Sequence, residues 1–110
     1  MTLGLGIPSD VPREGMFPGT HLHILAVDDE PTVLEVLATC LRAEGHSIEI
    51  CNSGSDALSR FVAGAWDLVI TDRSMPGMDG FQLARAIKQM APSTPVVLMT
   101  GMTAAIPMNE

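Results

Sequence analysis

The sequence predicts an α/β fold, a doubly wound parallel sheet with helices, from two observations. Short apolar runs alternate along the chain with amphipathic helical patterns, which is typical of parallel strands joined by right-handed helical crossovers. Acidic residues follow two of these apolar runs directly, Asp28 with Asp29 after one and Asp72 after the other. If the two runs are neighbouring strands, these carboxylates converge at the edge of the sheet where ligands bind.

The first strand is expected over residues 22–27, a short apolar run without alternation that is typical of a strand buried on both faces. A helix should follow, because Glu30 places negative charge near its start, Pro31 suits the first helical position and Gly45 ends the pattern. Its inner face is formed by Val33, Leu34, Leu37, Cys40 and Leu41.

A second strand is expected over residues 47–51, at an edge of the sheet because polar and apolar residues alternate there. Ser53 with Asp56 three positions later resembles a capping box and predicts the start of a second helix. The apolar face of that helix is predicted to contain Ala57, Leu58, Phe61 and Val62.

The third strand is predicted over residues 68–71 and the fourth over residues 96–100, with a helix between them that starts at Asp79 and Gln82. The inner face of this helix is predicted to contain Leu83, Ala84, Ile87 and Met90. Residues 103–110 suggest only the beginning of a further helix, which Pro107 would interrupt.

The length of 110 residues indicates one domain, preceded by a flexible leader over residues 1–20 that is rich in proline and glycine. The leader lacks the basic start and the apolar stretch of a signal peptide, and no run in the chain approaches the length of a membrane span. We therefore expect no membrane partner.

The net charge of −7 and the pI near 4.7 argue against direct binding of nucleic acid, which requires a basic surface. Cys40 and Cys51 form neither a metal-binding pair nor a disulfide framework, and we expect both to be buried, reduced thiols of a cytoplasmic protein. His21, His23 and His46 show no ligand spacing and are assigned no role.

Three carboxylates in one crevice would repel one another strongly. At about 4 Å and an effective dielectric constant of about 20, each pair of unit charges costs on the order of 4 kcal/mol. The cluster of Asp28, Asp29 and Asp72 therefore needs protons, a cationic side chain or a divalent cation. Mg²⁺, which prefers oxygen ligands, fits best.

Three stretches of the chain are similar, in order and spacing, to the signatures of the receiver domains of response regulators, a CheY-like family with a flavodoxin-like fold. They are residues 24–31 (ILAVDDEP), 67–80 (DLVITDRSMPGMDG) and 95–101 (PVVLMTG). The resemblance implies the strand order 2-1-3-4, which places the strands that end in the acids side by side. It also implies that residues 21–110 form a receiver domain, truncated before the family's fifth strand and helix.

The same resemblance implies a two-component signalling function in which Asp72 is phosphorylated by a sensor histidine kinase with Mg²⁺. Asp29 and Asp72 would bind the metal directly, Asp28 would act through a water, and Ser74 would contribute its backbone carbonyl. Thr100 would donate a hydrogen bond to the phosphoryl group and act as the switch residue. Pro76 and Gly80 are expected to shape the loop beside the site.

The chain departs from the family pattern at its carboxyl end, where receivers carry a lysine on their fifth strand. The only lysine here is Lys88, in the middle of a predicted helix, so no catalytic lysine is assigned. Without the fifth strand and helix, the edge of strand 96–100 would be open, and pairing through it would produce a homo-oligomer.

Two alternatives to a phosphoacceptor stay open at this level. The chain could be a pseudo-receiver or a receiver fragment that does not switch and acts through protein contacts. An aspartyl phosphohydrolase would need a second acid two residues after the nucleophile, where Ser74 stands, so we expect no enzyme. The kinase partner, the downstream output and the choice between a fragment, a decayed receiver and a chain completed by a partner are not encoded in these residues.

Overall fold

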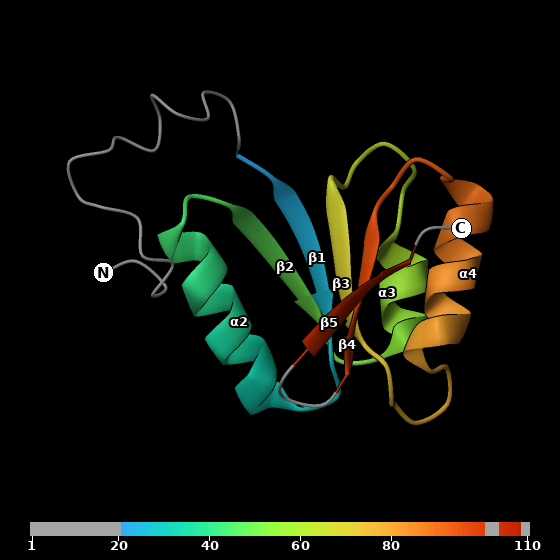
Figure 1. Cartoon of the computed structure of the whole chain (residues 1–110), viewed down its shortest axis with the longest axis horizontal. Helices are drawn as coiled ribbons and strands as arrows, with labels where there is room; N and C mark the ends of the chain where they lie inside the picture. Colours follow the sequence, from blue (N-terminus) through green and yellow to red (C-terminus); the bar gives the residue numbers. More distant parts are fainter. Residues whose placement is uncertain (1–20, 101–103, 109–110) are drawn as a thin grey trace.

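The structure, a computed structural model, describes residues 21–100 and 104–108. In that part of the chain, five strands form one sheet in the order β2-β1-β3-β4-β5, with helices on both faces (Figure 1). The strands are β1 (His23–Val27), β2 (Ser47–Cys51), β3 (Leu68–Asp72), β4 (Val96–Thr100) and β5 (Ala104–Met108). The helices are α2 (Pro31–Ala43), α3 (Gly54–Arg60) and α4 (Gly80–Met90).

The first four strands confirm the doubly wound sheet and the order 2-1-3-4. β1 pairs in parallel with β2 and β3, and β3 pairs in parallel with β4. The register places Val27 opposite Thr71, so β1 and β3 end together at the same edge of the sheet. The segments that carry the acids are therefore neighbours, as the strand order predicted.

The sheet separates two apolar layers. α2 lies on one face, and α3 and α4 lie together on the other (Figure 1). Successive residues of β1 contribute to opposite layers, Ile24 beneath α2 and Leu25 on the side of α3 and α4, and both are almost fully buried. This two-sided burial is the reason for the uninterrupted apolar run of β1.

Polar caps fix where α3 and α4 begin. The Asp79 carboxylate accepts a hydrogen bond from the Gln82 N–H, and the Gln82 side chain accepts one from the Asp79 N–H, which completes a capping box. At α3, the Ser53 hydroxyl accepts a hydrogen bond from the Asp56 N–H. Both starts match the positions predicted from sequence.

Two apolar residues that were assigned to inner helix faces are exposed instead. α3 ends at Arg60, and the extended backbone of Phe61 turns the chain so that Phe61 is buried while Val62 is 63% exposed. Met90 is the last residue of α4 and is 47% exposed. α3 is therefore shorter than its periodic pattern, whereas Met90 is exposed at the last position of α4; the pattern alone does not mark where a helix ends.

The two cysteines differ in environment, so the expectation that both are buried holds only for Cys51. Burial raises the pKa of Cys51 to about 11, which keeps it a neutral thiol at physiological pH. Cys40 is partly exposed on α2. Both are free thiols in the structure.

The segment after Thr100 contradicts the prediction of a helix and of an open β4 edge, although the parallel fifth strand of the family is absent from the described residues. β5 pairs antiparallel with β4, from Thr100 opposite Ala104 to Val96 opposite Met108. The edge of β4 is therefore covered. The prediction of a homo-oligomer that forms through an open β4 edge is not supported by this structure.

Two constraints explain this outcome. Pro107 lacks an N–H and disfavours a helix interior, yet it is tolerated in an edge strand such as β5. A parallel fifth strand would need a crossover of about a dozen residues or more, whereas only residues 101–103 separate β4 from β5.

No helix in the described ranges is long and apolar enough to cross a membrane. The predicted flexible leader, residues 1–20, lies outside the described residues.

The pairing of β5 with β4 predicts how removal of β5 changes the association of the protein. A variant that lacks residues 104–110 exposes the unpaired backbone groups of β4, and we expect it to self-associate at roughly 10 to 100 µM. A control that lacks only residues 109–110 keeps β5 and should sediment like the parent in analytical ultracentrifugation. Identical sedimentation of the two variants would contradict a protective role of β5.

Candidate functional site

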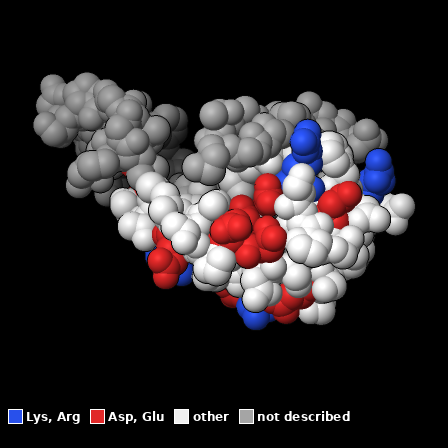
Figure 2. Space-filling model, turned by 90° about the horizontal axis from the view of Figure 1, so that it is seen from below, with Lys and Arg blue, Asp and Glu red and all other residues white. Residues whose placement is uncertain are grey.

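Three carboxylates meet at the carboxyl end of the parallel strands, as predicted. Asp28 and Asp29 directly follow β1, and Asp72 is the last residue of β3. One oxygen atom of each side chain lies within 4.8 Å of the others. Figure 2 views this end of the molecule and shows Asp and Glu side chains gathered near its centre, with Lys and Arg nearer its margin.

Asp28 is the buried member of this acidic cluster, with 4% of its surface exposed. Its N–H donates to the Cys51 carbonyl at 3.1 Å, and its Oδ1 accepts a hydrogen bond from the Glu30 N–H at 2.9 Å. Burial raises the pKa of the Asp28 carboxyl above its ordinary value of 3.8; the Glu30 N–H opposes this shift, while Asp72 and Asp29 add to it. The ionised form of Asp28 is therefore electrostatically destabilised in the absence of a cation.

The donor set fits a hard divalent cation. Asp29 is exposed and Asp72 is partly exposed, so both are accessible from solvent, whereas Asp28 lies behind them. Mg²⁺ takes oxygen ligands, keeps several waters and binds through one or two carboxylates, which suits this arrangement. A cation here would also offset the repulsion that contributes to the raised pKa of Asp28.

The other predicted site residues occupy the same edge of the sheet. Ser74 is exposed, two residues past Asp72 on the loop between β3 and α4. Thr100 ends β4, and the pairing of Asp72 with Met99 places the Thr100 backbone one residue beyond, beside the acidic cluster. The Thr100 side chain lies outside the described part of the structure, so its switch contact stays a prediction.

A shallow depression runs along the β3–α4 loop, beside the carboxylates rather than over them. It is lined by Arg73, Ser74, Met75, Pro76, Asp79 and Phe81. Gly77 turns the loop at a φ of 76°, in the left-handed region that glycine adopts without strain. The loop thus has the turn character predicted from its proline and glycine residues.

Lys88 lies on a helix away from the acidic cluster, as the sequence indicated. The Lys88 Nζ donates to the Pro92 carbonyl at 3.3 Å, at the end of α4 that is remote from Asp72. Arg73 is exposed at the rim of the depression. Neither position identifies a partner for a phosphoryl group on Asp72.

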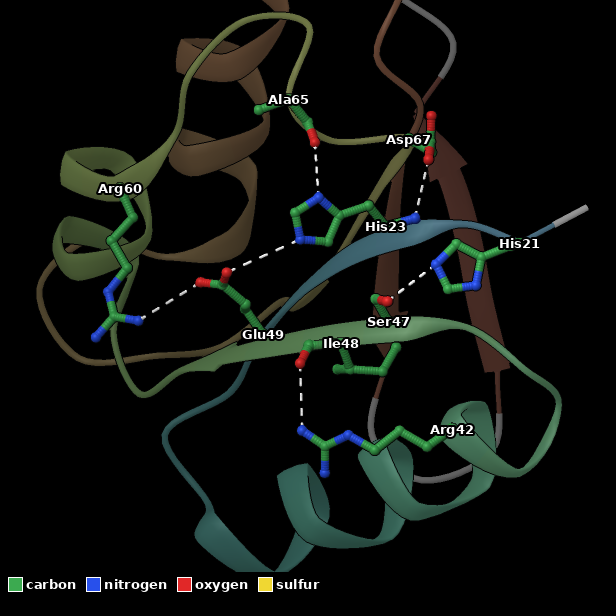
Figure 3. Close-up of polar contacts among 9 residues, drawn as sticks. All are labelled: His21, His23, Arg42, Ser47, Ile48, Glu49, Arg60, Ala65 and Asp67. Carbon is green, nitrogen blue, oxygen red and sulfur yellow. Dashed lines mark hydrogen bonds and ion pairs between the residues drawn. The ribbon is translucent and has the colours of Figure 1, made fainter.

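The histidines, which were assigned no role from the sequence, contact the amino ends of β1 and β2 and the segment before β3; Figure 3 draws His21 and His23. The His23 ring Nδ1 lies 2.9 Å from the Ala65 carbonyl and, with this acceptor, serves as the donor. The His23 N–H donates to the Asp67 carboxylate at 2.8 Å, and the His23 Nε2 faces the Glu49 carboxylate at 3.8 Å.

His21 and His46 add three further contacts at this end. The His21 ring contacts the Gly45 carbonyl and the Ser47 hydroxyl, and the His46 Nδ1 accepts a hydrogen bond from the Leu22 N–H. All of these contacts join residues far apart in sequence, so no local spacing could have indicated them. They lie at the opposite end of the sheet from the acidic cluster and are structural.

Comparison with known proteins gives a consistent result. Residues 24–109 match the family model for the response regulator receiver domain. The chain is 33% identical over 94 residues to the transcriptional regulatory protein TcrA of Mycobacterium tuberculosis, covering 80% of this chain and 37% of TcrA. It is 40% identical over 78 residues to the transcriptional regulatory protein GlrR of Escherichia coli, covering 71% of this chain and 18% of GlrR. The chain thus spans well under half of these relatives.

Solved structures agree with the sequence matches. The response regulator TrrA of Thermotoga maritima, in complex with Mg²⁺ and BeF, superposes with a TM-score of 0.69 at 38% identity. The match covers 74% of this chain and 70% of TrrA. Another matching structure contains TrrA in complex with the histidine kinase ThkA. This match has a TM-score of 0.68 at 38% identity and covers 74% of this chain and 71% of the matched chain.

The raised pKa of Asp28 predicts that Asp28→Asn stabilises the metal-free protein. Because the folded-state pKa lies above the ordinary 3.8, the parent loses stability as the pH rises from 3.8 through the raised value, and the deficit persists at pH 7. The amide can still accept the Glu30 N–H, so the variant should melt higher than the parent at neutral pH in EDTA and show a flatter pH profile.

Asp29→Asn is the matched control for this test, because it removes a charge from the same acidic cluster at an exposed position. It relieves repulsion but not burial, and we expect a smaller gain in melting temperature. An Asp28→Asn variant that melts below the parent at neutral pH would contradict the electrostatic account.

Proposed function

The chain belongs to the response regulator receiver family, and on this premise we propose that it is a two-component phosphoacceptor, phosphorylated on Asp72 by a sensor histidine kinase. The supporting observation is the set of three carboxylates within 4.8 Å at the carboxyl end of the sheet. A carboxylate can attack an anionic phosphoryl group only if positive charge is supplied, and this acidic cluster is where the fold can hold a cation.

The proposed reaction is a transfer from phosphohistidine to Asp72. An Asp72 carboxylate oxygen attacks phosphorus, the new O–P bond forms as the P–N bond breaks, and the histidine nitrogen leaves with its electron pair and takes up a proton. Bound Mg²⁺ would neutralise charge on the phosphoryl oxygens. Asp72 is suited to the nucleophilic role because it is partly exposed at the end of a buried strand.

The remaining residues would position the metal and the product. Asp29 and Asp72 would bind Mg²⁺ directly, Asp28 through a water, and Ser74 through its backbone carbonyl. Thr100 would donate a hydrogen bond to the phosphoryl group on Asp72. Each assignment is supported by its place at the same edge of the sheet.

Phosphorylation of this chain is expected to be slow. Lys88 is its only lysine and donates to Pro92 away from the acidic cluster, so it cannot neutralise a phosphoryl oxygen on Asp72. A desolvated phosphoryl oxygen without a charged partner loses on the order of 2 to 3 kcal/mol.

The position of Lys88 also favours a second candidate function, a pseudo-receiver or receiver fragment that binds partners without switching. In either case we propose that the chain is not an enzyme, because Ser74 occupies the position where a phosphohydrolase needs a second acid. For both candidates we propose a cytoplasmic location without direct contacts to nucleic acid or membrane, and for the phosphoacceptor a sensor histidine kinase as partner.

The acidic cluster predicts that Mg²⁺ stabilises the folded state. At a Mg²⁺ concentration of about ten times the Kd, linkage adds roughly 1.4 kcal/mol to the free energy of unfolding, which differential scanning calorimetry can detect. Asp29→Ala should abolish the effect and Asp28→Ala should weaken it. Ser74→Ala keeps the backbone carbonyl and serves as the control; a large loss there, or no response of the parent to Mg²⁺, would contradict this assignment.

The proposed nucleophile predicts a single phosphorylation site. With acetyl phosphate and Mg²⁺, intact-mass spectrometry should show slow, substoichiometric addition of one phosphoryl group, absent in Asp72→Asn and in EDTA. Asp67→Asn is a control, because Asp67 directly precedes β3 and lies at the opposite end of this strand from Asp72. Labelling that persists in Asp72→Asn would refute the assignment, whereas Mg²⁺ binding without any labelling would favour the pseudo-receiver.

A further inference from the structure

Two glycines, Gly54 and Gly80, lie against the segment from Asp72 through the loop between β3 and α4, residues 73–79. Their backbones approach this segment so closely that a side chain at either position would have no space. Gly80 opens α4 and Gly54 opens α3, and both are buried. Neither has a positive φ, so backbone conformation does not require glycine at these positions. Their common feature is close approach to the loop that follows Asp72.

Gly80 contacts the backbone of the proposed nucleophile itself. A Cβ at Gly80 would collide with the Asp72 carbonyl oxygen and lie 2.9 Å from the Arg73 Cα. The Gly80 N–H also donates to the Arg73 carbonyl at 2.9 Å, which closes the loop at its base. These are backbone atoms, so they cannot move aside as the end of a flexible side chain could.

Gly54 contacts the far part of the same loop from α3. A Cβ there would lie 2.8 Å from the Met78 carbonyl oxygen and 3.0 Å from the Met78 Cβ. The Met78 side chain packs against the core layer beneath α3 and α4, which limits its freedom to retreat. The amino ends of α3 and α4 therefore hold the loop from two directions.

The other described glycines are different in kind. Gly45, Gly64 and Gly77 have positive φ values, and nothing lies within 4 Å of a Cβ placed on any of them. These three glycines allow turns with a positive φ, whereas Gly54 and Gly80 allow close packing of backbone against backbone.

From this contrast we propose that Gly54 and Gly80 are positioning residues for the acidic site. Their close contacts fix the backbone of residues 72–79 and thereby the Asp72 carboxylate and the Ser74 carbonyl. The role in metal binding rests on the proposed function, but the fixing of the loop does not. Groups that orient metal ligands typically change metal affinity by about 10 to 100-fold when they are altered.

The test compares Gly80→Ala and Gly54→Ala with Gly64→Ala, a control that strains a turn of φ +87° in open space. Isothermal titration calorimetry measures Mg²⁺ affinity, thermal melting measures stability, and NMR hydrogen exchange without metal measures protection of the Arg73 and Asp79 amides. In the parent these amides donate to the Met99 carbonyl and the Gln82 side chain.

We expect Gly80→Ala to weaken Mg²⁺ binding by about tenfold or more and Gly54→Ala by a smaller factor, both with faster exchange at Arg73 and Asp79. Gly64→Ala should lower the melting temperature and leave affinity and exchange at the parent values. Parental affinity and exchange in Gly80→Ala would overturn the proposal. If that variant does not fold, the same two measurements on Gly54→Ala decide.

The hydrogen-exchange measurement separates this proposal from the proposed function. A parent protein that binds no Mg²⁺ would refute the metal site, and the exchange of Arg73 and Asp79 would still support or overturn the fixing of the loop by the two glycines. Loss of affinity in all three variants, Gly64→Ala included, would indicate general destabilisation and would count against a positioning role.

Discussion

The parallel pairing of β1 with β3 is the constraint on which the rest of the structure depends. It sets Val27 opposite Thr71, and this register brings Asp28 and Asp29 beside Asp72 although the two segments are distant in sequence. A shift of one residue would turn the side chains of a strand to the other face and separate these acids. β1 is buried in both apolar layers, so the position of the acids at its end depends on the packing of the core around this strand.

The acidic site is stabilised by neighbouring structure rather than by its own members. Burial and the other two carboxylates both raise the pKa of Asp28, so ionisation of Asp28 opposes folding when no cation is bound. The cost is offset by the apolar layers and by the hydrogen bond from the Glu30 N–H. Conflict of this kind between local stability and charge is common where a protein binds metal or performs chemistry.

Much of the fold and the site could be predicted from sequence because the signals were local. The four parallel strands, the capping box at Asp79 and the acids at the strand ends follow from periodicity and spacing. β5 was missed because its pairing depends on which chain segments lie next to β4, and the pattern around Pro107 fits a broken helix as well as an edge strand. The contact of His23 with Ala65 and the close approach of Gly54 to Met78 join residues that are distant in sequence. Local sequence patterns therefore could not predict them.

Residues at the two ends of the sheet have different roles, structural at the amino ends of the strands and chemical at the carboxyl ends. At the amino ends of the strands, histidine rings and the Asp67 carboxylate join neighbouring segments by hydrogen bonds, which restricts movement there (Figure 3). At the carboxyl ends the chain turns into loops, which are limited by hydrogen bonds such as that from the Arg73 N–H to the Met99 carbonyl and by close backbone contacts such as that of Gly80 with Asp72. Because packed strands deform little, a ligand bound at the acids would be expected to act first on these loops rather than on the sheet. The β3–α4 loop is therefore the segment through which binding at Asp72 would reach the surface.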